Sequence, residues 1–191
     1  MTCLTALVYT DTVAANRTLR DVARRLEAAG LHLAGVLQRD EVRPNRRRCD
    51  MVLEDLSGAT GINISQDRGS QARGCHLNVS ELLRAMQLVA GALATGPDLL
   101  IINKFGKTEV EGGGFRDLIV QAVDQGVPVL VAVPCRNLGS WRDFAGDMAR
   151  EIDLDQLEPE EALVQCLADP ALGRAPGLSA TVARADMCHI G

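Results

Sequence analysis

Continuous apolar runs alternate along this chain with stretches in which apolar residues recur at helical spacing. The apolar runs predict buried strands at residues 3–10, 31–38, 98–102 and 127–133. The helical spacing predicts helices at residues 15–29, 80–95, 114–125, 140–145 and 157–168. This alternation is typical of an α/β fold, in which a mostly parallel sheet carries helices on both faces.

One region departs from the alternation. A polar loop at 39–48 leads into the apolar segment MVLEDL, and a Ser57-Gly58 turn separates that segment from the alternating sequence GINIS. We therefore predict an inserted antiparallel β-hairpin over about residues 50–65. Outside this region, Gly30 is the expected end of the first long helix, and Asn78 or Ser80 is the expected cap of the second.

Length and composition limit the class of protein. The 191 residues fit a single domain over 1–169, followed by a loosely ordered tail at 170–191 that is rich in Ala, Gly and Pro. A net charge of −5 gives no attraction for nucleic acid or an anionic membrane. No apolar run nears the roughly 20 residues of a membrane span, and the first residues lack the pattern of a signal peptide. We expect a cytoplasmic protein with no membrane insertion, and a homo-oligomer is left open.

The first strand-to-helix loop is a candidate anion site, because such loops open at the carboxyl edge of a parallel sheet. From Asp11 to Thr18 the sequence reads D-x-x-x-x-N-R-T, which keeps the spacing of a phosphate-binding loop, G-x-x-x-x-G-K-[ST], without its glycines and lysine. The positive end of the next helix favours an anion, so the candidate ligand-binding residues are Asn16, Arg17 and Thr18. An ordinary turn capped by Thr10 or Asp11 is the alternative.

The second loop, 103–114, follows the strand at 98–102. In phosphate-handling folds the strand beside the first loop often ends in carboxylates that hold magnesium, but here Asn103 and Lys104 stand at that point. Lys104 and Lys107 are the only lysines in the chain. With Asn103 and Gly106 they are candidate ligand-binding residues, and the candidate catalytic residues are Glu109 and Glu111.

A third loop, SQDRGSQARGCHL, contributes two further kinds of candidate. Arg68 and Arg73 make it favourable for an anion. Cys75 and His76, together with Cys49, make a thiol-based metal or redox site an alternative, although the spacing is not diagnostic and two unrelated buried thiols are the favoured reading. Cys135, just past a predicted strand, is left as packing or ligand lining.

Several blocks of sequence resemble known families. The run DLLIINKFGKTEVEGGGFRD resembles the second nucleotide motif of small prokaryotic nucleoside-triphosphatases with a P-loop fold, in which an acidic pair is followed by Ile-Gly, Glu and Phe-Arg. Gly106, Glu109, Phe115 and Arg116 match that motif, whereas Asn103 and Lys104 replace the acidic pair. The blocks GVLQR, CDMVLEDL, ISQDRG, RGCHL, NKFGK and GFRD resemble an uncharacterised bacterial domain-of-unknown-function family related to those enzymes and associated with molybdate uptake genes.

The resemblance implies a P-loop-like α/β fold and an anionic ligand. Our first hypothesis is a degenerate P-loop-like protein that binds a nucleotide phosphate or an oxyanion such as molybdate, with weak or no hydrolysis. The second is an active nucleoside-triphosphatase with rearranged catalytic residues, for which Mg²⁺ with a nucleotide is the expected cofactor. A thiol-based accessory protein and a small interaction module remain as further alternatives.

Overall fold

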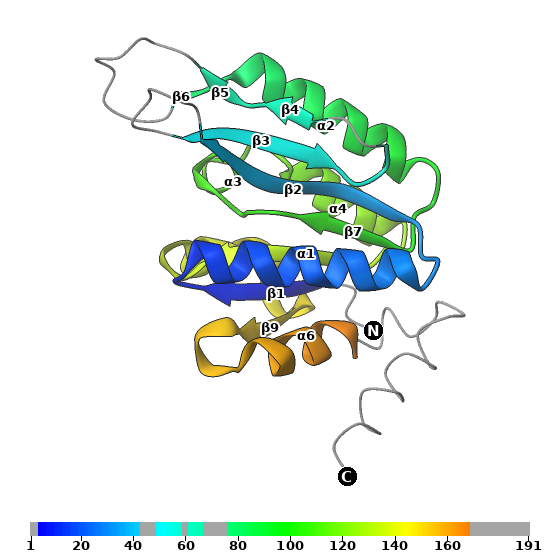
Figure 1. Cartoon of the computed structure of the whole chain (residues 1–191), viewed down its shortest axis with the longest axis vertical. Coiled ribbons are helices and arrows are strands. Elements are labelled where there is room, and N and C mark those ends of the chain that lie inside the picture. The colour runs from blue at the N-terminus through cyan, green and yellow to red at the C-terminus, as the bar shows by residue number, and fades with distance from the viewer. Residues whose placement is uncertain (1–3, 43–48, 59–60, 67–75, 169–191) are drawn as a thin grey trace.

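A computed structural model describes residues 4–42, 49–58, 61–66 and 76–168 (Figure 1). Its main sheet has the strand order β4-β3-β2-β7-β8-β1-β9. The strands of this sheet are β1 (Leu4–Tyr9), β2 (Leu33–Val42), β3 (Cys49–Asp55), β4 (Gly61–Asn63), β7 (Leu99–Ile102), β8 (Val129–Pro134) and β9 (Ala149–Asp153). A separate small pair consists of β5 (Ser65–Gln66) and β6 (His76–Leu77).

The sheet has a parallel part and an antiparallel part. From β2 through β7, β8 and β1 to β9, every neighbouring pair is parallel. On the other side, β2 pairs with β3 and β3 pairs with β4 in antiparallel fashion. The predicted hairpin is therefore confirmed, and the alternation in the apolar sequence correctly indicated a mostly parallel sheet.

The predicted polar loop at 39–48 is wrong in its first part. Strand β2 continues to Val42, which lies opposite Cys49 on β3. The polar residues Arg39 and Glu41 are accommodated because Arg39 forms ion pairs with Glu41 and with Glu54 on the neighbouring strand, at 2.6 and 2.8 Å. Cross-strand pairing of opposite charges thus lets a polar sequence extend the sheet.

Helices cover both faces of the sheet, as predicted. One buried cluster joins the sheet to α1 (Thr12–Ala28) and α6 (Pro159–Leu167). The other cluster joins the opposite face to α2 (Val79–Leu93), α4 (Arg116–Asp124) and α5 (Leu138–Ala145). The described residues also form short helical turns: α3 (Lys107–Val110), η1 (Cys135–Asn137), η2 (Gly146–Met148) and η3 (Leu154–Gln156). In Figure 1, α1 lies in front of the sheet and α4 behind it.

The helix ends follow the predicted capping residues. Asn78 caps α2 by accepting a hydrogen bond from the Glu81 backbone N–H at 3.3 Å. At the end of α1, the N–H of Gly30 bonds the Glu27 carbonyl, and the N–H of Leu31 bonds the Leu26 carbonyl. This is the Schellman arrangement, and the positive φ of Gly30 (84°) is the conformation that it requires.

The amino-acid pattern missed several short elements, among them β9 and α3. Strand β9, with the sequence AREID, is an edge strand in which only Ile152 is fully buried, so it carries no clear hydrophobic period. Helix α3 is four residues long and lies inside the predicted loop 103–114. Both elements are too short to produce a periodic signal in the sequence. Contacts with the rest of the fold set their positions instead.

Candidate functional site

The loops that follow β1, β7 and β8 open at the same edge of the sheet, as predicted, because those three strands are parallel. Two hydrogen bonds tie the loop after β7 to strand β8 and to the turn that follows β8. The Phe105 N–H donates to the Ala132 carbonyl at 2.8 Å, and the Asn137 side-chain amide donates to the Phe105 carbonyl at 2.8 Å. The expectation that the strand ending in Asn103 lies beside the first loop is wrong, since β8 lies between β1 and β7.

The turn after β1 is shorter than the connection expected between a strand at 3–10 and a helix that begins at residue 15. Strand β1 ends at Tyr9 and α1 begins at Thr12, so only Thr10 and Asp11 connect them. The Asp11 carboxylate accepts hydrogen bonds from the backbone N–H groups of Val13 and Ala14, at 2.8 and 3.4 Å. A carboxylate of the chain itself therefore occupies N–H groups that a phosphate-binding loop offers to its ligand.

The early start of α1 changes the surroundings of the candidate residues in the first motif. Asn16, Arg17 and Thr18 lie in the second turn of the helix rather than at its start. Thr18 is buried, Asn16 is partly buried and Arg17 is exposed. The structure thus does not bring these three side chains together around one point, although Arg17 remains accessible near the start of the helix.

Sequence reasoning missed Arg136 and Tyr9 at this edge. Burial raises the pKa of the Tyr9 phenol, while the positive charge of Arg136 and a hydrogen bond with the Thr12 side chain oppose that rise in pKa. Arg136 is exposed and lies two residues beyond the end of β8, and its charge acts on Tyr9 at the end of β1. The sequence signal that could have identified Arg136 is its position one residue beyond Cys135, just after a predicted buried strand.

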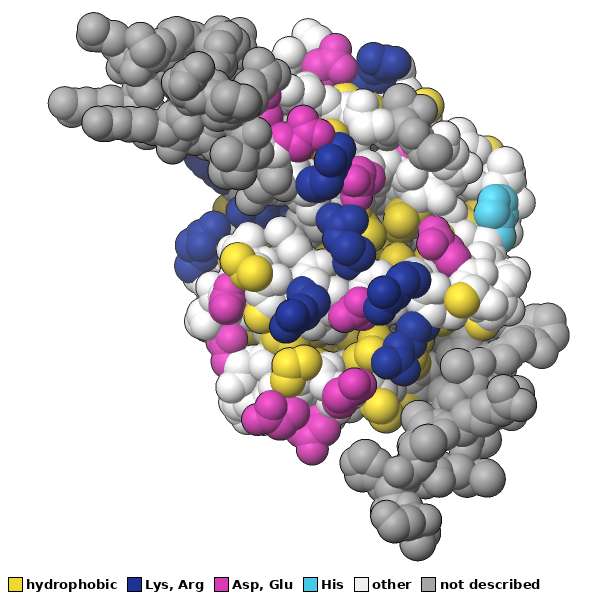
Figure 2. Space-filling view, viewed as in Figure 1, with side chains coloured by type: hydrophobic (Ala, Val, Ile, Leu, Met, Phe, Trp, Pro, Cys, Tyr) yellow, Lys and Arg dark blue, Asp and Glu magenta, His cyan; other side chains and the backbone are white. Residues whose placement is uncertain are grey.

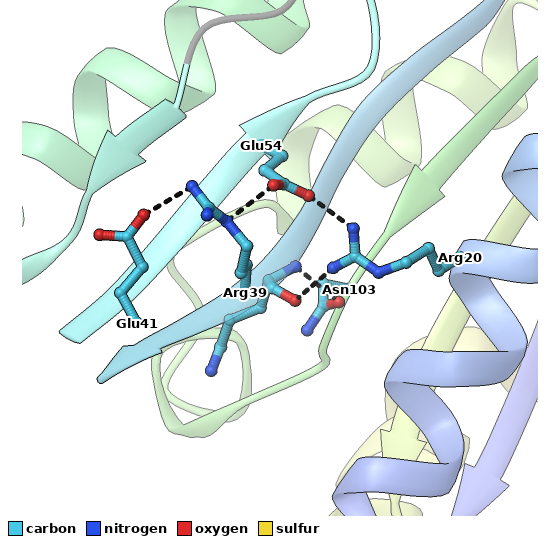
Figure 3. Close-up of polar contacts among 6 residues, drawn as sticks. Arg20, Arg39, Glu41, Glu54 and Asn103 are labelled. Carbon is cyan, nitrogen blue, oxygen red and sulfur yellow. Dashed lines mark hydrogen bonds and ion pairs between the residues drawn. The ribbon is translucent and has the colours of Figure 1, made fainter. Parts of the chain in front are cut away.

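Asn103 connects the end of β7 to β2. Its side chain is buried, and its Oδ1 accepts a hydrogen bond from the Gln38 backbone N–H at 2.8 Å. The Gln38 carbonyl in turn accepts from the Arg20 guanidinium at 3.2 Å (Figure 3). Because the paired residues of β7 end at Ile102, Asn103 supplies an acceptor to a strand that extends beyond its neighbour.

The loop after Asn103 is organised around Glu109. This carboxylate is buried, and its two oxygens accept from the backbone N–H groups of Gly106 and Phe115, at 2.8 and 3.1 Å. By contrast, Lys107 and Glu111 are exposed and form an ion pair at 3.4 Å. Lys104 is partly buried. The loop therefore places two lysines at the edge of the sheet, while the carboxylate of Glu109 bonds to the backbone.

A shallow groove beside α1 is a separate candidate location. It has a volume of about 350 Å³ and is lined by Arg20, Ala23, Arg24, Glu27, Leu37, Glu54, Asp55 and Leu56. Figure 2 shows Lys and Arg side chains over this face with acidic side chains between them. Arg20 bonds Glu54 and Arg24 bonds Asp21, at 2.7 and 2.8 Å. These pairs neutralise the charge, so the groove offers little attraction for an anion.

The remaining predicted residues lie outside what the structure describes. Arg68, Arg73 and Cys75 are outside the described ranges, and the side chains of Cys49 and His76 are likewise not described. Within the described part, no group of three or more His, Cys, Asp or Glu side chains is arranged to hold a metal ion. The described helices also include none that is long and apolar enough to cross a membrane.

The residues at the edge do not fit a magnesium–nucleotide complex. Such a site needs a hydroxyl at the start of the helix and an oxygen ligand on the neighbouring strand. Here Thr18 is buried well inside α1, and the Asn103 Oδ1 is bonded to Gln38. The Asp11 carboxylate also stands where the phosphates approach the helix, and it would repel them.

The fold is of the P-loop NTPase-like class. Two solved structures share the fold. A human cancer-related nucleoside triphosphatase has a TM-score of 0.62 and 16% sequence identity, and the match covers 87% of this chain and 98% of that one. THEP1 from the hyperthermophile Aquifex aeolicus has a TM-score of 0.53 and 18% identity, and the match covers 89% of this chain and 94% of that one. The chain belongs to the family described as "Protein of unknown function (DUF2478)", which matches residues 4–161.

A curated relative has a more specific name. The chain is 36% identical over 141 residues to the molybdenum import ATP-binding protein ModC 2 of Bradyrhizobium diazoefficiens. The match covers 74% of this chain but only 16% of that protein. A segment of a much longer polypeptide therefore resembles the domain described above.

Proposed function

We propose that the chain is a P-loop-derived domain that binds a tetrahedral oxyanion at the carboxyl edge of its sheet and does not hydrolyse nucleotides. Molybdate is the oxyanion that we assign to it, and its role is that of an accessory domain in molybdenum import. The observation that carries the proposal is the two-residue turn after β1, in which Asp11 caps α1 with its own carboxylate.

The closed turn argues against nucleotide hydrolysis. A phosphate-binding loop wraps the phosphates with several backbone N–H groups, and it needs glycines and a lysine to do so. Here the connection is too short to wrap a phosphate chain, and two of the N–H groups at the start of α1 are already bonded. Hydrolysis at this place has neither the cradle nor the oxygen ligands that phosphoryl transfer uses.

Positive side chains at the same edge support an oxyanion ligand. Lys104, Lys107 and Arg136 follow the two neighbouring strands β7 and β8, and the loops that carry them are bonded to each other. A small dianion needs only a few such donors and no wrapping loop. The name of the curated relative supports molybdate as the first oxyanion to test.

A thermal-stability panel tests the proposal. The purified chain is heated with molybdate, tungstate, sulfate and phosphate, and with ATP or GTP in the presence of Mg²⁺. A ligand at about 100 times its Kd stabilises the fold by about 2.7 kcal/mol, which corresponds to a rise in Tm of roughly 5–10 °C in a protein of this size. We expect this rise with molybdate.

Lys107→Ala and Lys104→Ala/Lys107→Ala are the matched variants for this panel. Both should reduce the rise in Tm with molybdate, and the double variant should reduce it most. A molybdate effect of equal size in the wild-type chain and the double variant would place the ligand elsewhere. The absence of any oxyanion effect would favour a small interaction module, in which the fold persists without the ligand.

A further inference from the structure

The loop between β7 and α4 is held together by one buried side chain. We infer that Glu109 is a positioning residue, whose carboxylate clamps the two ends of the loop between Gly106 and Phe115 and thereby fixes the backbone that carries Lys107. We call these two hydrogen bonds, from the Gly106 N–H and the Phe115 N–H to the Glu109 carboxylate, the Glu109 clasp. The inferred effect on the ligand rests on the proposed function, whereas the clasp itself does not.

The first support is the depth at which the carboxylate lies. Glu109 is 5% exposed, and a buried carboxylate is tolerated only where donors satisfy its oxygens. Each of its oxygens accepts one backbone N–H, and those two amides are nine residues apart in the chain. One of the two bonds also caps α3, because the carboxylate at the third helical position reaches back to the residue before the helix.

The second support is the glycine that lies against the carboxylate. Gly114 has a φ of 60°, and a Cβ at this position would collide with the Glu109 side chain, whose atoms are its nearest neighbours. Gly112 also has a positive φ, of 90°, but a Cβ there would meet nothing within 4 Å. The space for the clasp is thus provided by the absence of a side chain at Gly114.

The third support is the attachment of the clasp to an aromatic cluster. The Arg116 guanidinium donates to the Glu109 carbonyl at 3.3 Å and lies over the Phe144 ring, 4.4 Å from its centroid. Phe144 packs against Phe105 and Trp141, with ring centroids 5.7 and 5.8 Å away. The clasp therefore holds the loop against α5, the helix that follows the neighbouring strand β8.

This arrangement gives Glu109 a role different from activation of water. Both of its oxygens are already acceptors of backbone N–H groups, and its backbone carbonyl is bonded to Arg116. The neighbouring Glu111 is exposed and belongs to the same short loop. Of the two candidate catalytic carboxylates, Glu109 fixes the shape of the loop, and Glu111 lies on its surface beside Lys107.

A double-mutant cycle tests the clasp without any ligand. Gly114→Ala should lower the Tm by about 8 °C, because it adds a collision to the strain of a positive φ. Gly112→Ala is the matched control and should lower the Tm by only about 3 °C, from the strain alone. In a Glu109→Ala background, the additional effect of Gly114→Ala should fall to that of Gly112→Ala. An equal effect of Gly114→Ala in both backgrounds overturns the clasp.

A milder variant keeps the test decisive if Glu109→Ala does not fold. Glu109→Gln retains the shape of the side chain but replaces one acceptor oxygen with an NH₂ group. Amide hydrogen exchange, measured by NMR, should show that Gly106 or Phe115 loses its protection in this variant, while the core strands keep theirs. Unchanged protection at both amides overturns the clasp as well.

The positioning role has its own readout, the Kd for molybdate. We expect Glu109→Gln to raise this Kd at least fivefold, and Gly112→Ala to leave it within twofold of the wild-type value. If the double-mutant cycle shows the clasp but Glu109→Gln leaves the Kd for molybdate unchanged, the positioning role is overturned. If the wild-type chain binds no oxyanion, the proposed function and the positioning role both fail, whereas the cycle still decides whether the clasp exists.

Discussion

Two strand-to-helix turns at one edge of the sheet use a carboxylate in different ways. In the turn after β1, Asp11 is exposed and bonds two N–H groups in the first turn of its own helix. In the turn after β7, Glu109 is buried and bonds two N–H groups at opposite ends of a loop. The Asp11 carboxylate caps the helix that follows a two-residue turn, whereas the Glu109 carboxylate fixes the shape of a longer loop.

The difference indicates which turn can carry a ligand. The closed turn has no loop to wrap a phosphate chain, and its N–H groups are bonded to Asp11. The open turn presents Lys104 and Lys107 on a backbone that is fixed to the core through Glu109, Arg116 and the aromatic cluster. We therefore propose that the anion binds at the second turn rather than the first.

The largest expected effect is that of Glu109→Ala. This substitution leaves the partly buried N–H of Gly106 and the buried N–H of Phe115 without their acceptor, so it should destabilise the protein by about 3 kcal/mol. That loss corresponds to a decrease in Tm of roughly 6–12 °C. Chemical denaturation of the variant and the wild-type chain measures it, with Glu111→Ala as the exposed control from the same loop. Equal stability of the two variants would contradict the account.

Asn103→Ala should have an intermediate effect. It removes the buried acceptor of the Gln38 N–H, which costs about 1–2 kcal/mol. Asn103→Asp keeps an acceptor oxygen at the same place, so we expect it to be more stable than Asn103→Ala. Denaturant midpoints rank the two variants, and a less stable Asp variant would show that the local environment rejects a carboxylate more strongly than it needs the hydrogen bond.

Asp11→Ala should cost less, about 1 kcal/mol, because it removes an exposed helix cap whose N–H groups can bond to water instead. Asp11→Asn retains an acceptor and should lie closer to the wild-type chain. Thermal unfolding measured by circular dichroism separates the three proteins. A loss as large as that of Glu109→Ala would remove the distinction between the two turns.

The smallest effect on stability should come from Lys107→Ala. Lys107 is exposed and its ion pair with Glu111 is on the surface, where such pairs contribute little. We expect an unchanged Tm without ligand and a Kd for molybdate that is about fivefold higher, since one charged donor is lost. Titration calorimetry measures the Kd. A lower Tm with an unchanged Kd would reverse the roles that we assign to Lys107 and Glu109.

The sequence predicted those parts of the fold that rest on local pattern. The apolar runs located the central parallel strands, and Asn78 and Gly30 marked helix ends because their side-chain or backbone preferences are local. The order of the strands was not accessible in this way, so β8 was not expected between β1 and β7. Strand order depends on long-range packing, which a single sequence does not display.

The sequence predicted which loops meet at the carboxyl edge of the sheet, but not the geometry of those loops. The carboxyl edge followed from the alternation of strands and helices, and the two lysines stood out in the sequence. The early start of α1 was missed because the spacing of Asp11 to Thr18 imitates a phosphate-binding loop. The role of Glu109 was missed because its partners, Gly106 and Phe115, are backbone groups, and backbone amides leave no signature in the sequence.

The most direct test of the central claim is steady-state phosphate release from ATP and GTP with Mg²⁺. If Asp11 and the short turn close the nucleotide site, the wild-type chain should release no more phosphate than Glu109→Gln or a blank without protein. Magnesium-dependent turnover in the wild-type chain that disappears in Glu109→Gln would contradict the account. That result would make Glu109 a catalytic residue and the chain an active nucleoside-triphosphatase.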